Sequence, residues 1–561
     1  MPAESRAATK RARIAGAAIP SVAERRRTIE AEALPRNMAA LISEASRAYG
    51  DRLVWDFFEG GEMLTYRDLE PRVHALADGL RSVGVRRGSH VAVMMPNKAA
   101  MPLSWLAIAT IGAVMVPVNN TYSEREIVYV LTDSETEFLI VDESCLAPVE
   151  SVLARGELRL DRGKIIVSGE SGHSYLDLEQ LMRIEPHTPF IDEAVGHDDL
   201  LNIQYTSGTT GFPKGCMLSQ RYWISAGKVN AFRDGRHYRH ILASTPFYYM
   251  DPQWLLLMSL YQHATLHVAK RQSASRFMEW VREREIEFCL LPVLTLKQPP
   301  HPDDRQNALI RSNVYGVSKL THGALEERFD VCAREAFGMT EIGPTLFMPI
   351  EATDMVGSGS CGVPCPFREV RVADDQGNSL PPGEIGELLV RGPGILKGYY
   401  NRPDATRDAF HGDWFRTGDL FRMDDRGFLY IVGRIKDSIR RSGENIAARE
   451  VESVLNSFDG VVEAVAVPVP DEARGQEIKA MIVWVDAVFG EPDLTALIAH
   501  CQRNLAPFKV PRYFQFVPEL PKTSSGKIAK HQLVSGSTAA SARVYDRASG
   551  AVIATTGAPH A

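Results

Sequence analysis

Apolar runs alternate with amphipathic stretches between about residues 36 and 200, and this alternation narrows the choice of folds more than any other feature of the chain. The expected elements follow in this order: a strand at Ser89–Met95, a helix at Lys98–Ile111, a strand at Ala113–Val118, a helix at Glu124–Leu131 and a strand at Glu137–Val141. Strands that are separated by helices of this length form parallel sheets, and the helices cover both faces of each sheet. The sequence therefore predicts an α/β fold built on parallel sheets.

The residue pattern changes twice further along the chain. Short alternating strands with tight turns between residues 369 and 400 predict a small β subdomain. After Gly433 the expected elements are helices at Ala448–Asn456 and Pro492–Leu505 and strands at Val461–Val467 and Lys479–Val485. A chain of 561 residues is too long for one ordinary domain. We expect a large N-terminal domain over residues 36–435, joined by a hinge to a small α+β C-terminal domain over residues 436–534.

Both ends of the chain are expected to be disordered tails. Residues 1–35 carry the basic clusters Lys10–Arg13 and Arg25–Arg27, which predict a solvated extension or, alternatively, a targeting or anion-binding segment. Residues 535–561 are rich in Ser, Ala, Gly and Thr and have little to bury. No apolar segment follows the basic start, and no run of about 18 apolar residues is long enough to cross a bilayer. We therefore expect no membrane partner.

Composition excludes other function classes. The net charge of −7 argues against a nucleic-acid-binding protein. The seven cysteines have no framework spacing, which indicates reduced thiols and a cytoplasmic location. Cys361 and Cys365 lie four residues apart, but no second pair of Cys or His follows at the spacing of a zinc site. His237 and His240 also lack such a second pair, so we expect no zinc site at either place.

A loop rich in hydroxyl groups and glycines follows the apolar run Leu200–Gln204. It reads Tyr-Thr-Ser-Gly-Thr-Thr-Gly-Phe-Pro-Lys-Gly over residues 205–215. Backbone N–H groups, hydroxyls and one lysine suit a polyphosphate, and the glycines allow the chain to approach it closely. The spacing is not that of a Walker A loop. If the loop follows a strand, it lies where open α/β sheets bind ligands, although such a composition is also typical of a flexible linker.

Further motifs follow the loop in a fixed order. They are Phe337-Gly338-Met339-Thr340-Glu341, Trp414-Phe415-Arg416-Thr417-Gly418-Asp419, the stretch Gly433–Ile446 and Pro521–Ile528. Together with the loop, they resemble the signature motifs of the adenylate-forming superfamily of acyl-CoA synthetases and related AMP-binding enzymes. The resemblance covers roughly residues 36–532. Phe337 stands where the superfamily usually has Tyr, which keeps the stacking surface and loses one hydroxyl.

The resemblance implies a role for each motif residue. Nucleotide contacts are implied for Thr206, Ser207, Gly208, Thr209, Thr210, Lys214, Gly316, Phe337, Gly338, Thr340, Asp419, Arg434 and Lys527. Glu341 would hold Mg²⁺, and Lys527 would bridge the substrate carboxylate and the α-phosphate. These two residues, together with Thr206 and Lys214, are the catalytic residues that the resemblance implies. Lys436 would be the hinge, and Gly443 and Tyr249 would line a thiol channel.

The implied reaction explains the residue types. A carboxylate must approach the α-phosphorus of ATP, and the repulsion between the two anions requires the positive charges of Lys527, Lys214 and Mg²⁺. An acyl-adenylate would form, and coenzyme A would then take the acyl group after a domain rotation. Two alternatives remain open at this point: transfer to a carrier-protein thiol or an amine, and a non-catalytic nucleotide-binding regulator.

The substrate is a small carboxylic acid that the sequence does not name. Residues 245–254 and 297–300 are most similar to the crotonobetaine/carnitine-CoA ligase branch of the superfamily, with Tyr249 where a histidine is common. Residues expected in the substrate pocket are Tyr248, Tyr249, Asp251 and Trp254. Asp251 and the aromatic rings would attract an ammonium group on the acid; the alternative is a packed aromatic cluster beside a surface aspartate. The oligomeric state is left open between monomer and homodimer.

Overall fold

The chain divides into two compact units, which we describe separately. The computed structural model describes residues 19–169, 174–206, 213–317, 319–435, 438–441, 444–471, 474–485, 492–522, 528–534 and 543–554. The first unit comprises Met1–Thr206, Lys214–Glu369 and Val390–Phe415. The second comprises Ser207–Pro213, Val370–Leu389 and Arg416–Ala561, so that residues 370–389 and 416–435 group with the C-terminal residues. The boundary that we expect at residue 435 stays a prediction.

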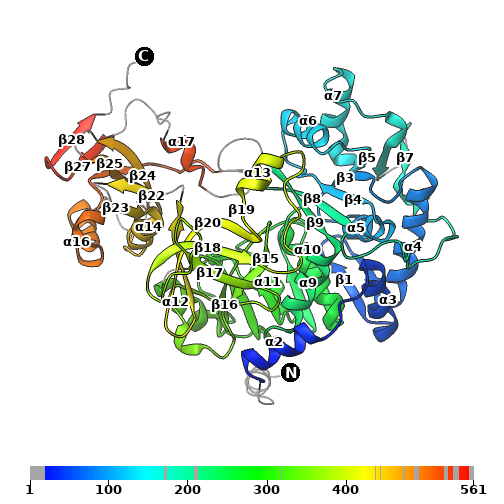
Figure 1. The fold of residues 1–561 in the computed structure, drawn as a ribbon, viewed down its shortest axis with the longest axis horizontal. Helices are drawn as coiled ribbons and strands as arrows, with labels where there is room; N and C mark the ends of the chain where they lie inside the picture. Colours follow the sequence, from blue (N-terminus) through cyan, green and yellow to red (C-terminus); the bar gives the residue numbers. More distant parts are fainter. Residues whose placement is uncertain are drawn as a thin grey trace. The chain divides into compact units, whose positions relative to one another are not determined.

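The first unit contains a seven-stranded sheet that is almost entirely parallel (Figure 1). Its strand order is β7 (Leu176–Asp177), β6 (Ile165–Ser168), β5 (Phe138–Asp142), β3 (His90–Met94), β4 (Val114–Pro117), β8 (Leu200–Thr206) and β9 (Lys214–Ser219). Only the β8–β9 pair is antiparallel. Apolar side chains of α6 (Glu124–Asp133) and α7 (Leu146–Ala154) pack on one face, and α5 (Ala100–Ile111) lies on the other. The expected strands and helices of this region are confirmed.

The helix boundaries in this sheet follow from local chemistry. Ser123 caps α6 by accepting a hydrogen bond from the Glu126 N–H, and the Glu126 side chain binds back to the Ser123 backbone. Gly112 ends α5 in the left-handed region, with φ 74°, which a glycine adopts without strain.

A second sheet of the first unit is parallel in its centre and antiparallel at its edges. Its order is β16 (Ser360–Pro364), β15 (Gly343–Phe347), β14 (Ala333–Met339), β13 (Arg311–Val314), β12 (Phe288–Leu290), β10 (His240–Ala243), β11 (Thr265–Val268), β1 (Leu53–Phe57) and β2 (Glu62–Thr65). Strands from β14 to β1 run parallel. The other elements of this unit are α2 (Val22–Ala31), α3 (Met38–Tyr49), α4 (Tyr66–Ser82), α8 (Leu178–Leu181), α9 (Gln220–Phe232), α10 (Met250–Gln262), α11 (Phe277–Glu283), α12 (Lys319–Phe329), α13 (Pro403–Asp408) and β19 (Phe410–His411).

The second unit combines a β segment with a small C-terminal sheet and its helices. The β segment contains most of β17 (Glu369–Ala373), β18 (Ile385–Arg391) and β20 (Trp414–Met423), and all of β21 (Leu429–Arg434). The C-terminal sheet has the order β23 (Glu444–Ala447), β22 (Ser438–Arg441), β25 (Gly475–Trp484), β26 (Tyr513–Phe516), β27 (Arg543–Asp546) and β28 (Ala551–Ala554). Strand β24 (Val461–Asp471) also pairs with β25. Its helices are α14 (Ala448–Asn456), α16 (Leu494–Asn504) and α17 (Lys530–Val534). The C-terminal strands and helices that the sequence predicts are confirmed, with β24 longer than expected.

The expectation of disordered tails is wrong for parts of both ends. Residues 22–31 form helix α2. Ser21 is its N-cap and forms a capping box with Glu24. Residues 543–554 form the β27–β28 hairpin, which extends the C-terminal sheet because β27 pairs with β26. Arg512 binds Asp546 across this pairing, with Nε and Oδ1 3.0 Å apart. Charge and composition did not reveal either element. Helix α2 binds residues far away in the sequence, and β27 pairs with β26 as well as with its hairpin partner β28.

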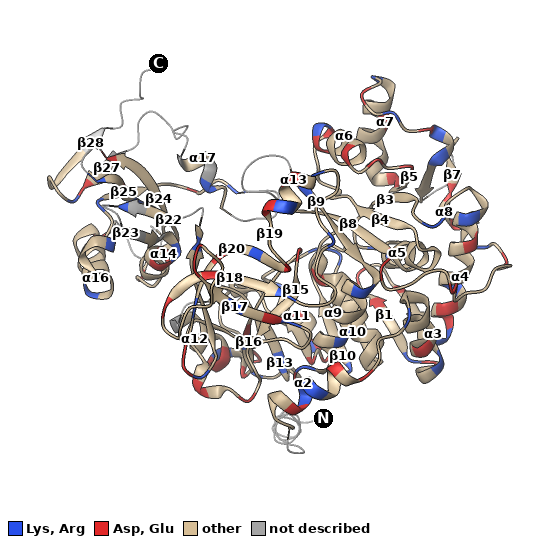
Figure 2. Cartoon of the chain, viewed as in Figure 1, with Lys and Arg blue, Asp and Glu red and all other residues tan. Residues whose placement is uncertain are grey.

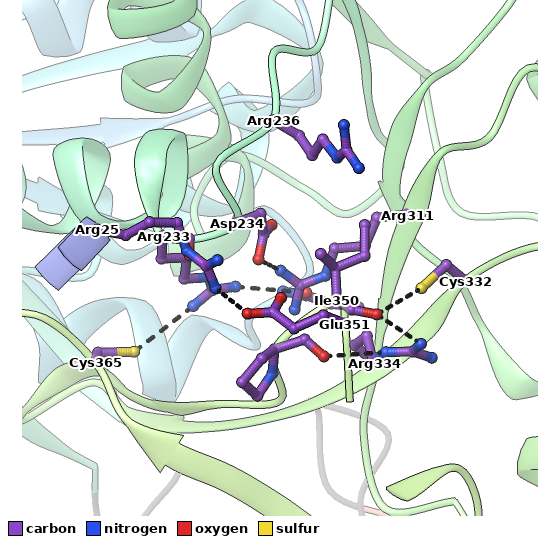
Figure 3. A network of polar contacts seen from close by, with 12 residues as sticks. Arg25, Arg233, Asp234, Arg236, Arg311, Cys332, Arg334, Ile350, Glu351 and Cys365 are labelled. Carbon is purple, nitrogen blue, oxygen red and sulfur yellow. Dashed lines mark hydrogen bonds and ion pairs between the residues drawn. The ribbon is translucent and has the colours of Figure 1, made fainter. Parts of the chain in front are cut away.

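A buried arginine of helix α2 binds residues far away in the sequence (Figure 3). Arg25 is 5% exposed; its Nε donates to the Arg233 carbonyl at 2.8 Å, and its Nη2 lies 2.9 Å from Glu351 Oε1. Gly235 leaves space for this side chain, since a Cβ there would come within 2.9 Å of Arg25 Cδ. Arg25 therefore belongs to the core of the domain and not to a solvated tail.

Charged residues of both signs are interspersed over the described helices and strands (Figure 2). The net charge of the whole chain is −7. Among the described residues, none of the helices has both the length and the apolar composition required to cross a bilayer.

Replacing Arg25 tests the anchoring of α2. We expect Arg25→Ala to lower the free energy of unfolding by about 2 kcal/mol, because the Arg233 carbonyl and the Glu351 carboxylate lose a buried charged donor. Urea unfolding of the first unit, followed by tryptophan fluorescence, measures the change. Arg27→Ala is the matched control, since Arg27 is exposed on the same helix and its loss should stay within about 0.5 kcal/mol. Equal effects of the two substitutions would contradict the anchor.

Candidate active site

The expected phosphate loop connects two antiparallel strands of the first unit. Thr206 ends β8 and Lys214 begins β9, and the two residues are direct partners in the ladder. The Thr206 hydroxyl donates to the Lys214 carbonyl at 3.5 Å. Ser207, Gly208, Thr209 and Thr210 lie outside the described residues. The loop therefore connects two strands, whereas a Walker A loop leads into a helix.

Segment 396–400 holds Lys214 beside Glu341. Backbone hydrogen bonds join the segment to β9: Met217 N to Gly398 O at 2.9 Å, Lys397 N to Met217 O at 2.9 Å, and Tyr400 N to Gly215 O at 2.8 Å. The Leu396 N–H donates to the Glu341 carbonyl at 2.7 Å. The same short segment thus binds both the strand that begins at Lys214 and the turn that contains Glu341.

Tyr399 connects the two charged side chains directly. The Lys214 Nζ lies 4.3 Å from the centre of the Tyr399 ring, and the Tyr399 hydroxyl donates to Glu341 Oε1 at 3.0 Å. Burial and the Glu341 carboxylate raise the pKa of Tyr399, so the phenol remains a donor. Tyr399 belongs to none of the motifs that the sequence displays. The aromatic pair Tyr399-Tyr400 after Gly398 was the only signal, and it does not disclose a contact with residue 341.

Cys216 is a buried, neutral thiol near this contact. It lies on β9, opposite Tyr399 in an isolated bridge, and is fully buried. Burial raises the pKa of Cys216 well above its ordinary value, and the nearby Glu341 carboxylate raises it further. The thiol therefore adds no charge to the site.

The expected Phe-Gly-Met-Thr-Glu motif forms the end of β14 and the turn into β15. A Cβ at Gly338 would come within 2.5 Å of the Gly343 carbonyl oxygen, so this close approach requires glycine. Phe337 pairs with Leu346 and is half-buried, as is Thr340, whereas Glu341 is 9% exposed. The turn therefore places an almost buried carboxylate at its tip.

Gly316 lies next to this motif because a second carboxylate fixes its loop. Glu335 on β14 accepts from the Gly316 N–H at 3.2 Å and from the Val317 N–H at 2.9 Å. Gly316 has φ 66°, a conformation that favours glycine. Sequence reasoning missed Glu335, which lies two residues before Phe337.

The expected substrate residues gather at the start of α10. Tyr248 and Tyr249 contact each other with ring centres 4.6 Å apart, and Trp254 Nε1 donates to Asp251 Oδ1 at 3.1 Å. Tyr248 is buried, with its carbonyl accepting from the Gln204 side chain at 2.8 Å. Trp254 is also buried, whereas Tyr249 and Asp251 are half-buried. The aromatic cluster is therefore packed on one side and accessible on the other.

Tyr315, which directly follows β13, joins this group, and no motif of the sequence indicated it. It keeps 48% of its surface exposed, and Asn313 Nδ2 donates to its hydroxyl at 3.4 Å. Although much of its surface is exposed, desolvation of the hydroxyl and the Asp251 carboxylate raise the pKa of Tyr315. The end of β13 and the first turn of α10 therefore present a phenol and a carboxylate to the same place.

The second unit holds the expected ribose-binding pair. Asp419 on β20 and Arg434 on β21 are direct cross-strand partners, and the Arg434 Nε lies 2.8 Å from Asp419 Oδ1. The Asp419 N–H donates to the Thr417 hydroxyl at 3.1 Å, and that hydroxyl donates to the Leu388 carbonyl at 2.8 Å. Thr417 thereby fixes the strand around the almost fully buried Asp419.

Other expected site residues lie outside the described residues. They are Lys436, Gly443 and Lys527, and their roles stay predictions. Within the described part of the chain, no three His, Cys, Asp or Glu side chains gather as a metal centre. The single carboxylate of Glu341 nevertheless fits Mg²⁺, because this ion commonly takes one or two carboxylates and completes its shell with phosphate oxygens and water.

Comparisons with known proteins agree with this arrangement. The family described as AMP-binding enzyme matches residues 42–400, and its C-terminal domain matches residues 450–527. The chain is 32% identical to a feruloyl-CoA synthase from Amycolatopsis sp, over 84% of this chain and 94% of the relative. It is 32% identical to the sulfoacetate–CoA ligase of Cupriavidus necator, over 89% of this chain and 97% of that protein.

A solved structure shares the architecture. ATP-bound MatB from Rhodopseudomonas palustris superposes with a TM-score of 0.78 and 25% identity, covering 89% of this chain and 98% of MatB. The family match spans well over half of the chain and includes every described motif of the first unit up to Tyr400. The chain therefore belongs to the AMP-binding family of adenylate-forming enzymes.

Proposed function

We propose that the enzyme activates a carboxylic acid with ATP and then transfers the acyl group to coenzyme A. The observation that carries this proposal is the joint placement of Lys214 and Glu341 around Tyr399, at the end of the loop between β8 and β9. A cation and a carboxylate at this point suit a triphosphate and its metal ion. The names of the relatives, which are CoA ligases and synthetases, support a thioester product.

The first half-reaction joins the substrate carboxylate to the α-phosphorus of ATP and releases pyrophosphate. Lys214 neutralises the triphosphate, and Lys527 neutralises the attacking carboxylate, so that two anions can approach each other. When bound at Glu341, Mg²⁺ supplies further positive charge for the departing pyrophosphate. Asp419 accepts from the ribose hydroxyls and fixes the nucleotide, and the product is an acyl-adenylate.

The second half-reaction uses a different arrangement of the C-terminal residues. Rotation at Lys436 withdraws Lys527 and brings the segment around Gly443 to the acyl-adenylate. The thiol of coenzyme A enters past Tyr249, attacks the acyl carbon and expels AMP. A carrier-protein thiol or an amine is the alternative acceptor, and a requirement for added coenzyme A distinguishes the two. All seven cysteines are free, which supports our proposal of a cytoplasmic enzyme.

Substitutions at Lys527 and Gly443 separate the two half-reactions. We expect Lys527→Ala to reduce acid-dependent ATP–pyrophosphate exchange by at least about a thousandfold, because one charge that stabilises the transition state is lost. The same variant should convert supplied acyl-AMP and coenzyme A to thioester at nearly the normal rate. Gly443→Leu should show the reverse pattern, because its side chain obstructs thiol entry. Identical losses in both assays would contradict the division of labour.

The nucleotide contact of Asp419 is testable without turnover. Asp419→Asn should weaken AMP binding by about tenfold to a hundredfold in titration calorimetry, because one charged acceptor for the ribose hydroxyls is lost. Asp425→Asn is the matched control, since Asp425 is exposed on the turn between the same two strands. Unchanged AMP affinity in Asp419→Asn would remove the ribose role.

We further propose that the acid carries an ammonium group. Asp251, the two tyrosines Tyr248 and Tyr249, and Trp254 offer a carboxylate and aromatic faces, both of which attract cations. The half-buried positions of Asp251 and Tyr249 and the neighbouring phenol of Tyr315 support a polar pocket wall over a purely packed cluster.

A charge-neutral substitution tests this preference. Asp251→Asn should reduce kcat/KM for a betaine-like acid by at least about tenfold, because a charged contact is lost. The value for a neutral acid of the same length should change by less than about threefold. Equal losses for both acids, measured by pyrophosphate release, would reject the ammonium group while leaving the adenylation proposal intact.

A further inference from the structure

Tyr399 makes three different kinds of contact, through its ring, its hydroxyl and its backbone. Its ring lies under the Lys214 ammonium group at 4.3 Å, its hydroxyl donates to Glu341 at 3.0 Å, and its backbone pairs with Cys216 on β9. The residue is 7% exposed. A buried side chain that contacts one cation and one carboxylate through different ends has a defined orientation in the site.

The backbone of segment 396–400 does not require this side chain. The hydrogen bonds at Leu396, Lys397, Gly398 and Tyr400 hold the segment on β9 and on the Glu341 turn through main-chain atoms. A phenylalanine would fill the same volume at residue 399. The hydroxyl therefore contributes something other than the docking of the segment.

The position of the ring suggests what that contribution is. Lys214 and Glu341 have opposite charges and contact the ring face and the hydroxyl of the same tyrosine, yet among the ion pairs of the described residues none joins them. A direct ion pair would leave both groups partly neutralised before a substrate arrives. Instead, the ammonium group rests on the π face of the ring and the carboxylate accepts from the neutral hydroxyl, so each charged group contacts Tyr399 and not the other.

We propose that Tyr399 is a positioning residue that holds Glu341 and Lys214 apart at a fixed distance, so that one metal–triphosphate complex meets both. The inference rests on the proposed function, because that function assigns the metal ion to Glu341 and the triphosphate to Lys214. The hydroxyl orients the Glu341 carboxylate toward the metal ion, and the ring prevents Lys214 from pairing with that carboxylate. Tyr399 itself touches no reacting atom.

Two substitutions at residue 399 separate the hydroxyl from the ring. Tyr399→Phe keeps the ring and removes the donor, and Tyr399→Leu removes both. Tyr400→Phe is the matched control, because the Tyr400 hydroxyl also donates to a carboxylate, that of Glu135 at 2.7 Å, but on the protein surface. Thermal melting of each variant verifies that it is folded before binding is compared.

The principal readout is metal binding without turnover. Free Mn²⁺ is measured by electron paramagnetic resonance in the presence of the protein and β,γ-imido-ATP, a non-hydrolysable analogue. We expect Tyr399→Phe to weaken nucleotide-dependent Mn²⁺ binding by about tenfold, because the carboxylate loses its orienting hydrogen bond. Tyr399→Leu should in addition weaken binding of the analogue itself by about fivefold, because Lys214 is then free to pair with Glu341. Tyr400→Phe should stay within about twofold of the wild type in both measurements.

The outcomes distinguish this inference from the proposed function. If Tyr399→Phe binds Mn²⁺ as tightly as the wild type or tighter, or if the wild type shows no nucleotide-dependent Mn²⁺ binding, the inference is overturned. If Mn²⁺ binding changes as expected but the wild type shows no acid-dependent pyrophosphate exchange, the positioning role stands and the proposed reaction fails. If exchange occurs and only the Tyr400→Phe control alters Mn²⁺ binding, the reaction stands and the role of Tyr399 is rejected.

Discussion

The pairing of segment 396–400 with strand β9 is the contact on which the candidate active site of the first unit depends. Lys214 and Glu341 are separated by more than a hundred residues and lie on different sheets, the first on the edge strand β9 and the second between β14 and β15. Main-chain hydrogen bonds from one short segment reach both. Because backbone groups make these bonds, their geometry does not depend on flexible side chains.

Electrostatics explains why the site is built from few charges. Cys216 is a thiol, Tyr399 is a phenol, and both have raised pKa values, so the immediate neighbours of Lys214 and Glu341 are neutral. In a partly buried environment a single charge acts more strongly than it does in water. The second unit also uses few charges: Asp419 has Arg434 as its cross-strand partner, and the hydroxyl of Thr417 accepts a hydrogen bond from the Asp419 backbone.

Sequence reasoning reached the residues that belong to ordered local motifs. The loop that ends at Lys214 was predicted from its spacing and composition, and Glu341, Asp419 and Arg434 were selected through the resemblance to a known superfamily. The alternation of apolar runs predicted the strands and helices of the first sheet. Sequence reasoning could not reach Tyr399, Glu335 or Tyr315, because their importance arises from contacts with residues distant in the sequence. Helix α2 and the β27–β28 hairpin were missed for the same reason: Arg25 appears in the sequence as one of three adjacent basic residues, and only the distant Arg233 carbonyl and Glu351 distinguish it from Arg27.

A crystal structure of the enzyme with Mg²⁺ and β,γ-imido-ATP tests the central claim most directly. The account predicts that the Lys214 Nζ lies about 3 Å from an oxygen of the β- or γ-phosphate, and that a Glu341 carboxylate oxygen lies about 2.1 Å from the metal ion. Tyr399 should keep its ring under Lys214 and its hydroxyl on Glu341. A triphosphate bound away from the end of β9, or a metal ion without contact to Glu341, would contradict the account.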